Sequence, residues 1–260
     1  MMIPVLQVRG LHKHYRKHES LFKRTYKQAL APISFDLYAG ETLAFVGEAG
    51  SGRSSLAQVL AGAKPRSGGQ ILLQGEELLT KDRRRRSQDI RMIFQDPSTS
   101  LNPRLRIGAQ LEEPLLFNTE MSAEQRMEAV AVGLIRVGLL REHADFYPHM
   151  LAHGQRQRIA IARALMLDPK VVIADEAFSG LDTSLRAQCI NLMLQLQRQM
   201  GLSYVLMSHD LGLVRHMSDR VVVMKKGKIV EQGDTETVFA TPQHDYTKRL
   251  LESQFFKKKH

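Results

Sequence analysis

Cysteine and membrane-length apolar runs are what this sequence lacks. Its single cysteine, Cys189, cannot form an internal disulfide or a cysteine-only metal site, which favours a reducing compartment. The stretch nearest to a membrane span, EAVAVGLIRVGLL, is shorter than the roughly 20 residues that cross a bilayer, and it carries Arg136. The opening residues, MMIPVLQVRG, do not follow the layout of a signal peptide. We therefore expect a chain that does not enter a membrane by itself.

Positive charge is in excess, with a formal net charge of +10 over 260 residues. It gathers in the runs RKHESLFKR, KDRRRRSQ and FFKKKH, each of which alone is typical of a solvated loop or tail. Together the runs fit a protein that lies against an anionic membrane face, although nucleic acid or a nucleotide would also suit this charge. The composition, 43% hydrophobic and 25% charged, predicts a globular protein with a substantial core.

Short apolar runs alternate with helical patterns along the chain. TLAFVG, KVVIAD and SYVLMS are almost wholly apolar and precede helical patterns, as expected of parallel strands covered on both faces. Pairs of runs near each end of the chain should be antiparallel, with turns at Gly40, Gly75, Gly227 and Gly233. The stretch AEQRMEAVAVGLIRVGL has helical spacing. The pattern predicts an α/β core with a helical insertion.

The most informative stretch, TLAFVGEAGSGRSSLAQVLAG, combines a strand, a glycine loop and a helix. Glycines let backbone N–H groups turn inward around phosphate oxygens, and the positive end of the helix dipole faces the same anion. Ser54 is placed for a magnesium ion and Ser55 for a hydrogen bond to an α-phosphate. A tight turn without a ligand is the alternative. The predicted phosphate loop consists of Gly47, Glu48, Ala49, Gly50, Ser51, Gly52, Arg53, Ser54 and Ser55.

An acidic pair follows the run KVVIAD. Asp175 can hold magnesium through water, and Glu176 can polarise an attacking water molecule. Acidic pairs at strand ends are common by themselves. Following a phosphate loop, this pair supplies both the metal ligand and the base of a nucleotide hydrolase.

With these motifs in place, the sequence resembles the ATP-binding subunits of ABC transporters over nearly its whole length. IFQDPSTSLNP resembles their Q-loop, LAHGQRQRIAIARAL their LSGGQ signature and its helix, SGLD their D-loop, and SHD their switch region. The resemblance implies roles for Tyr15 in stacking on adenine, Gln95 in magnesium binding and catalysis, and His209 in contacting the γ-phosphate. It also implies nucleotide contacts from Ala152, His153, Gly154, Gln155 and Asp182. Taken singly, Tyr15, Gln95 and His209 would each be ordinary surface or loop residues.

The resemblance implies a RecA-like P-loop NTPase core with an antiparallel β subdomain and an inserted α-helical subdomain. The expected single ABC ATPase domain, 1–260, has its core at 1–95 and 158–240, its helical insertion at about 96–157 and a short tail at 241–260. FQDPSTSLNPR and TPQHDYTKRLLES resemble the ATPases of oligopeptide and dipeptide importers in particular.

The implied function is ATP binding and hydrolysis, with Mg²⁺, coupled to transport of peptides, with antimicrobial peptides and polyamines as further cargoes. The implied partners are a second, non-identical ABC ATPase subunit, two transmembrane permease subunits and, indirectly, a periplasmic solute-binding protein. No nucleic acid is expected, and the location would be peripheral, at the cytoplasmic face of the inner membrane. A single cysteine excludes the cysteine-ligated iron–sulfur cluster of some peptide-importer ATPases.

Three positions depart from the family pattern. Arg53 replaces the loop lysine, Ala152 the signature serine and His153 the first signature glycine. Guanidinium is wider than ammonium, so we predict that ATP still binds but is hydrolysed slowly in this site. In this family, two subunits clamp ATP head to tail. A homodimer would therefore carry all three departures in each of its two sites, whereas a heterodimer would have Arg53 in one site and Ala152 with His153 in the other.

Two rival functions stay open at this stage. The first is a partner subunit that binds nucleotide but hardly hydrolyses it, which Arg53 favours and intact Glu176 and His209 oppose. The second is a soluble ABC-type ATPase that acts on nucleic acid or ribosomes. The charge permits this, whereas the importer-like Q-loop and the presence of only one ATPase unit oppose it.

Overall fold

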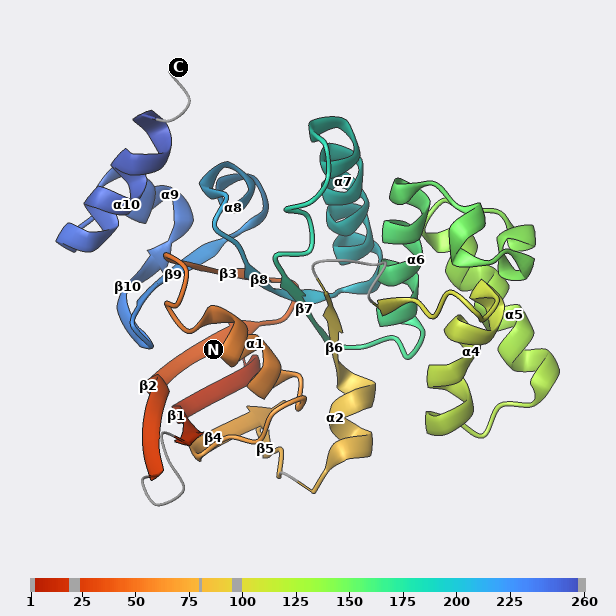
Figure 1. The fold of residues 1–260 in the computed structure, drawn as a ribbon, viewed down its shortest axis with the longest axis horizontal. Helices are drawn as coiled ribbons and strands as arrows, with labels where there is room; N and C mark the ends of the chain where they lie inside the picture. Colours follow the sequence, from red (N-terminus) through yellow and green to blue (C-terminus); the bar gives the residue numbers. More distant parts are fainter. Residues whose placement is uncertain (1–2, 19–23, 80, 95–99, 257–260) are drawn as a thin grey trace. The chain divides into compact units, whose positions relative to one another are not determined.

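The computed structural model describes residues 3–18, 24–79, 81–94 and 100–256 (Figure 1). The chain divides into two compact units, one made of Met1–Arg86 with Ser203–His260 and the other of Ser87–Leu202. The short helix α2 (Arg83–Asp89) crosses the boundary between them.

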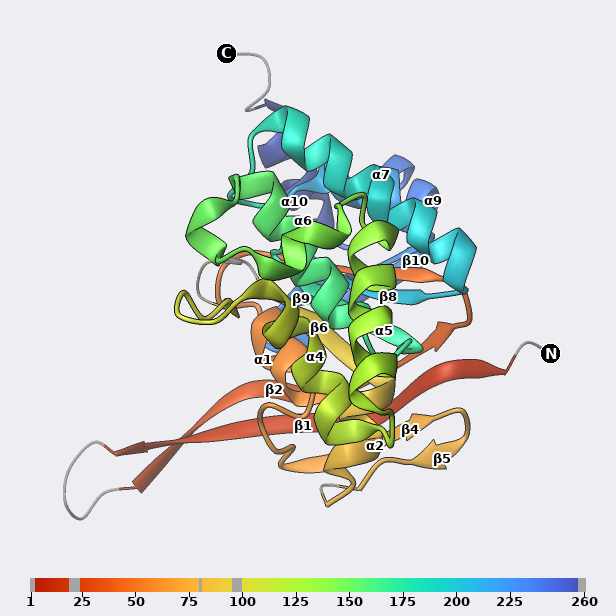
Figure 2. The same cartoon turned by 90° about the vertical axis from the view of Figure 1, so that its right-hand side faces the viewer.

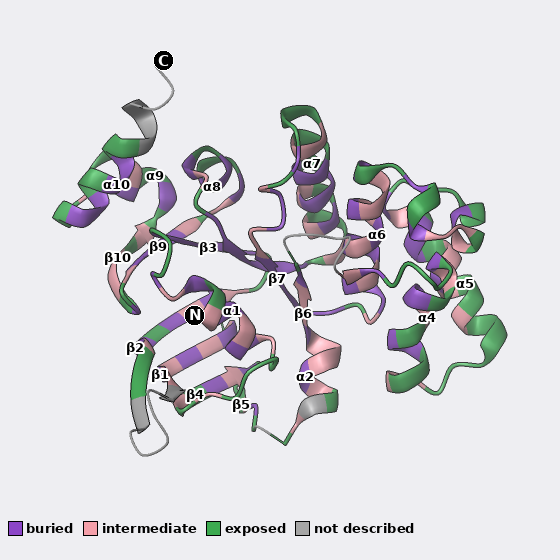
Figure 3. Cartoon of the chain, viewed as in Figure 1, coloured by how far each residue is buried: buried purple, intermediate pink, exposed green. Residues whose placement is uncertain are grey.

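An antiparallel sheet forms part of the first unit, with the strand order β2-β1-β4-β5. Figure 2 shows β1 (Pro4–His18) and β2 (Arg24–Tyr38) running side by side as a long hairpin. Along β1, buried residues alternate with more exposed ones, as the banding in Figure 3 shows, because successive side chains point to opposite faces. The strands β4 (Gly68–Leu73) and β5 (Glu76–Glu77) complete this predicted antiparallel part.

The first unit also holds parallel strands. β3 (Thr42–Val46) pairs in parallel with both β8 (Ser203–Met207) and β9 (Arg220–Lys225), and all residues of β3 and β8 are buried. These strands confirm that TLAFVG and SYVLMS are central parallel strands. The remaining elements of this unit are β10 (Lys228–Asp234), which is antiparallel to β9, and the helices α1 (Arg53–Leu60), α8 (Leu211–Met217), α9 (Thr235–Ala240) and α10 (Asp245–Phe256).

One predicted turn glycine is misplaced. Gly233 lies inside β10, opposite Val221, whereas the other three predicted turn glycines do lie in turns. The hairpin between β9 and β10 closes instead at Lys226 and Gly227, whose φ angles of 48° and 79° are both left-handed. A Cβ at 233 would lie 3.1 Å from a methyl carbon of Val238 in α9, so any larger residue would require that methyl group to shift.

The second unit pairs two parallel strands with helices. β6 (Ile90–Ile93) is parallel to β7 (Val171–Asp175), which confirms the parallel assignment of KVVIAD. Helices α4 and α5 lie side by side in Figures 1 and 2, and the described residues between 103 and 152 form no strand. The helical elements are α4 (Ile107–Asn118), α5 (Ala123–Arg136), the 3₁₀ turns η1 (Arg141–Asp145) and η2 (Pro148–Met150), α6 (His153–Leu165) and α7 (Thr183–Met200). The domain boundaries expected from the sequence stay a prediction.

No helix in the described part of the chain is long and apolar enough to cross a membrane.

Candidate nucleotide-binding site

The predicted phosphate loop joins β3 to α1, and its backbone shape requires glycine at two positions. Gly47 has a φ of 153°, and a side chain there would fall on the carbonyl oxygen of Met224. Gly52 has a φ of 107°, and an added Cβ would lie 2.8 Å from the carbonyl oxygen of Ala29. Both positions therefore need a residue without a side chain.

Neighbouring strands fix the loop from outside. The amide of Gly227, in the β9–β10 turn, donates to the carbonyl of Ser51 at 2.7 Å. Within the loop, the Ser51 amide donates to the carbonyl of Glu48 at 3.0 Å. The first hydrogen bond along α1 runs from the amide of Leu56 to the carbonyl of Gly52. The amides before Leu56 therefore belong to the positive end of the helix, where an anion is favoured.

A cavity of about 580 Å³ opens over this loop, a volume suited to a small ligand. Tyr15 of β1 lies in it, with its hydroxyl 3.5 Å from the Ser55 hydroxyl and the Lys13 ammonium 4.9 Å from its ring centre. The predicted base-stacking ring and the phosphate loop thus share one cavity. Its lining consists of Tyr15, Lys27, Gln28, Ala29, Lys226 and loop residues 48–55.

The cavity fits a phosphate by the chemistry of its own atoms. The hydroxyl of Ser51 is buried, and no hydrogen-bond partner faces it among the described residues. A buried polar atom without a partner is costly, so a ligand oxygen at this loop would relieve that cost.

Arg53 begins α1 and is only 9% exposed, so the positive charge of this position is held inside the protein. Its charge acts electrostatically on Tyr246 of α10. Burial raises the pKa of the Tyr246 phenol, and the nearby Arg53 charge acts in the opposite direction. Arg53 also lines the wall of the cavity.

His209 reaches the same sheet edge as the loop. Phe45 of β3 pairs with Met207 of β8, so Gly47 and His209 each follow that pair by two residues. Next to His209, the side chain of Asp210 accepts hydrogen bonds from the amides of Gly212 and Leu213 and caps α8. This cap fixes the short loop that presents His209 to solvent.

The predicted acidic pair belongs to the second unit. Asp175 is the last residue of β7, and Glu176 follows with a φ of 50°. A left-handed conformation in a residue other than glycine costs on the order of 1–3 kcal/mol, and such strain gathers at functional sites. The carbonyl of Glu176 is held by the amide and the hydroxyl of Ser179, at 3.1 and 3.0 Å.

The predicted signature lies at the beginning of α6. Ala152 has the extended backbone of an N-cap, and its amide donates to the side-chain oxygen of Gln155 at 2.9 Å. Half of a reciprocal capping box is thus present, but the methyl group of Ala152 cannot supply the other half. His153 is exposed beside it.

Helix α7 fixes two other predicted residues. A Cβ at the buried Gly154 would lie 2.7 Å from a methyl carbon of Leu185. Asp182 caps α7, because its carboxylate accepts the amide of the same Leu185 at 3.0 Å. Gly154 and Asp182 therefore each have a structural role at α7, in addition to the nucleotide contact predicted for them.

Sequence reasoning missed Gln157 and Tyr246. The buried side chain of Gln157 donates to the carbonyl of Ala177 at 2.9 Å and so ties α6 to the segment after Glu176. Tyr246 accepts the amide of Glu48. The burial of a polar residue at these positions could not be known before the fold.

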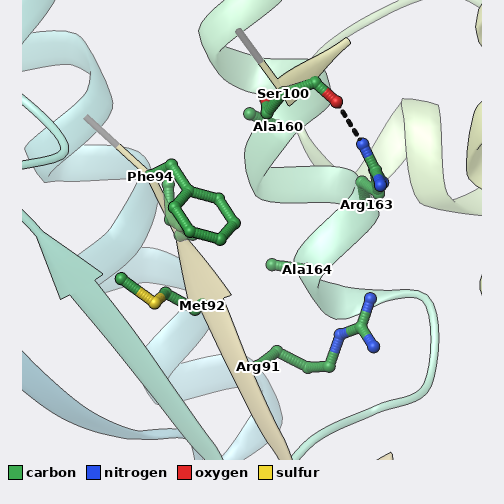
Figure 4. Close-up of a pocket in the computed structure, with 8 residues that line it drawn as sticks. Arg91, Met92, Phe94, Ser100, Ala160, Arg163 and Ala164 are labelled. Carbon is green, nitrogen blue, oxygen red and sulfur yellow. Dashed lines mark hydrogen bonds between the residues drawn. The ribbon is translucent and has the colours of Figure 1, made fainter. Parts of the chain in front are cut away.

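Gln95 lies outside the described residues. Just before it, β6 contributes to a cavity of about 260 Å³ (Figure 4). Phe94 stands 49% exposed there, and Arg163 donates to the carbonyl of Ser100. Burial, followed by the Arg163 charge, lowers the pKa of Arg91. The pocket therefore combines positive charge with an exposed ring. Its lining is Arg91, Met92, Ile93, Phe94, Ser100, Ala160, Arg163 and Ala164.

The motifs and the geometry together define an ATP-binding cassette. A family model described as ABC transporter matches residues 30–179, and the chain therefore belongs to that family. Among solved structures, a dimeric ATP-binding cassette in a post-hydrolysis state with ADP and Pi resembles this chain with a TM-score of 0.76. That match is 25% identical and covers 88% of this chain and 98% of the other.

Individual relatives match nearly the whole of this chain. The putrescine export system ATP-binding protein SapF of Escherichia coli strain K12 is 49% identical over 255 residues, which cover 98% of this chain and 95% of SapF. The SapF of E. coli O6:H1, called a peptide transport system ATP-binding protein, has the same identity and coverage. The dipeptide transport ATP-binding protein DppF of E. coli K12 is 51% identical over 253 residues, which cover 95% of this chain and 75% of DppF.

These matches confirm the predicted RecA-like P-loop NTPase fold, the membership in the ABC transporter family and the activity as an ATPase. The individual roles of the predicted site residues remain predictions.

Proposed function

We propose that this ATPase drives a peptide transporter of the inner membrane. The observation that carries this is the identity of about half, over at least 95% of this chain, with ATPases named for peptide and dipeptide transport. Polyamines are the second candidate cargo, because a relative of equal identity is named for putrescine export.

The proposed partners are two transmembrane permease subunits, a second ATPase and, indirectly, a periplasmic binding protein. A peripheral position on the membrane face suits the net charge of +10. The pocket formed by Arg91, Phe94 and Arg163 supports a docking place for the membrane subunits, since an apolar residue and an acidic one could both be received there (Figure 4).

The chain's own residues account for the chemistry as follows. The Tyr15 ring stacks on the base, and the loop amides together with Ser55 hold the phosphates. Glu176 orients and polarises water, and His209 contacts the transferred phosphate. Mg²⁺, when bound, neutralises charge on the phosphate oxygens, and its ligands would be Ser54, Asp175 and Gln95.

The same residues define a weakened site. Arg53 cannot place its charge where a lysine ammonium would, so hydrolysis is slowed while backbone binding is retained. In the head-to-tail arrangement of the family, Ala152 and His153 serve the partner's nucleotide. A non-identical partner with an intact loop lysine and signature serine would keep the two faults in separate sites.

The alternative is a subunit that closes on ATP but hardly hydrolyses it. Arg53 favours it, whereas the presence of Glu176 and His209 opposes it. Turnover measured with and without the partner ATPase separates the two.

The test is purification of the tagged chain in mild detergent, followed by reconstitution of the complex into vesicles with labelled dipeptide or putrescine. We expect two membrane proteins and a second ATPase to copurify, with transport that depends on ATP and fails in Glu176→Gln. Recovery with RNA or ribosomes in place of membrane proteins would contradict the proposal.

A further inference from the structure

The C-terminal helix touches the phosphate loop through one hydroxyl group. The amide of Glu48 donates to the phenol oxygen of Tyr246 at 3.0 Å, although 198 positions separate the two in the chain. Tyr246 is the second residue of α10 and is only 3% exposed. The contact is therefore a partly buried tertiary link to the first turn of the loop.

Several neighbours fix the position of Tyr246. The Lys225 ammonium lies 4.7 Å from the centre of the Tyr246 ring. The backbone amide of Tyr246 donates a hydrogen bond to the imidazole of His244 at 3.0 Å. The carboxylate of Glu231 accepts the amides of Gln243 and His244, at 2.8 and 3.0 Å. The turn that begins α10 is thus tied to β10, and the phenol has little freedom to move away from the loop.

The chemistry of this phenol suits a permanent acceptor. Burial raises its pKa, so the hydroxyl stays neutral at physiological pH and keeps an oxygen available for the Glu48 amide. Arg53 acts on the same group electrostatically. The geometry thus links Tyr246 to the beginning of the phosphate loop through its hydrogen bond with Glu48.

We propose that Tyr246 is a positioning residue of the nucleotide site, whose hydroxyl holds the loop at Glu48 in its phosphate-gripping shape. It does not touch the nucleotide. A loop that is already ordered loses less conformational entropy when the nucleotide binds. Removing the hydrogen bond between Tyr246 and Glu48 should therefore weaken the affinity for ATP. The packing of α10 on β10 positions Tyr246 and thereby influences the affinity for ATP.

The test compares Tyr246→Phe with Tyr38→Phe in the full chain. Both changes remove one phenolic oxygen, but the Tyr38 ring lies against Arg220, and among the described residues no hydrogen bond joins its hydroxyl to the loop. We expect the Kd of Mg–ATP, measured by titration calorimetry, to rise about fivefold in Tyr246→Phe, as for the loss of one hydrogen bond, and to stay unchanged in Tyr38→Phe. An unchanged Kd in Tyr246→Phe would overturn the proposal.

A second readout separates positioning from mere stability. We expect the Glu48 amide to be protected from hydrogen exchange in the nucleotide-free wild type and to lose protection in Tyr246→Phe, with little change in melting temperature. If that variant fails to fold, hydrogen exchange in the wild type still tests the proposal, because an unprotected Glu48 amide there would refute the contact with Tyr246. Wild-type protein that binds no ATP would overturn the assignment as an ATPase instead.

Discussion

Arg53 is the residue at which the phosphate loop departs most from its family motif. A lysine would carry a compact charge to the phosphates, whereas the guanidinium is planar and wider. We predict that Arg53→Lys speeds single-turnover hydrolysis in the assembled transporter about tenfold, since one well-placed donor is worth roughly 2.7–4 kcal/mol and a misplaced one less. A rate that does not rise would remove Arg53 as the cause of slow hydrolysis.

Tyr15 provides a second test at this scale. Its ring should matter more than its hydroxyl, which only approaches Ser55 at 3.5 Å. We predict that Tyr15→Leu raises the Kd of ATP at least fivefold, because stacking of a base on an aromatic ring is worth about 1–3 kcal/mol. Tyr15→Phe should bind as the wild type does. Equal losses in both variants would show that the hydroxyl, and not the ring, carries the interaction.

The residues that the sequence predicted are those whose signal is local. The glycine loop and the acidic pair each occupy a few consecutive positions next to a strand. Gln157 and Tyr246 gave no such signal, because their partners are the backbone atoms of Ala177 and Glu48, far away in the chain. Contacts of this kind become visible only when the fold has brought the segments together.

The N-terminus of α6 lacks the side-chain oxygen that an N-cap residue usually supplies. Ala152 has N-cap geometry and Gln155 already accepts its amide. Ala152→Ser would complete the capping box, so we predict a gain of about 1 kcal/mol in the free energy of unfolding by urea. Ala152→Val, which adds bulk without an oxygen, should give no gain. Equal stability in Ala152→Ser and the wild type would contradict the described cap.

Helix α7 can be tested through its cysteine. Cys189 is buried, and burial raises the pKa of its thiol, although the Arg158 charge opposes the shift. At neutral pH, less thiolate is present than in an ordinary cysteine, and reagent access is blocked. We predict slow alkylation by iodoacetamide in the native protein, fast alkylation in urea, and a native rate that grows as pH rises. Equal rates in both conditions would show that α7 does not pack as described.

Elements were predicted more reliably than turns. Apolar runs fixed the strands, since burial on both faces leaves a continuous signal. Gly233 misled the prediction because Gly227 precedes the run KIVEQG and Gly233 ends it, and only the backbone angles show that the turn uses Lys226 and Gly227.

At the scale of the whole molecule, the site residues are divided between two units. Tyr15, the loop and His209 belong to the first, and the acidic pair belongs to the second with Ala152, His153, Gly154, Gln155 and Asp182. The sequence could order these motifs along the chain but could not show this division. The departures at Arg53 and at Ala152 with His153 are the reason for our proposal that a different subunit supplies the intact counterparts.

The most direct measurement is the steady-state ATPase rate of the purified chain, alone and mixed with the proposed second ATPase. We predict a low rate for the chain alone, even at concentrations that allow it to pair with itself, and at least a tenfold higher rate in the mixture. A homodimer that hydrolyses ATP as fast as the mixture would contradict the account.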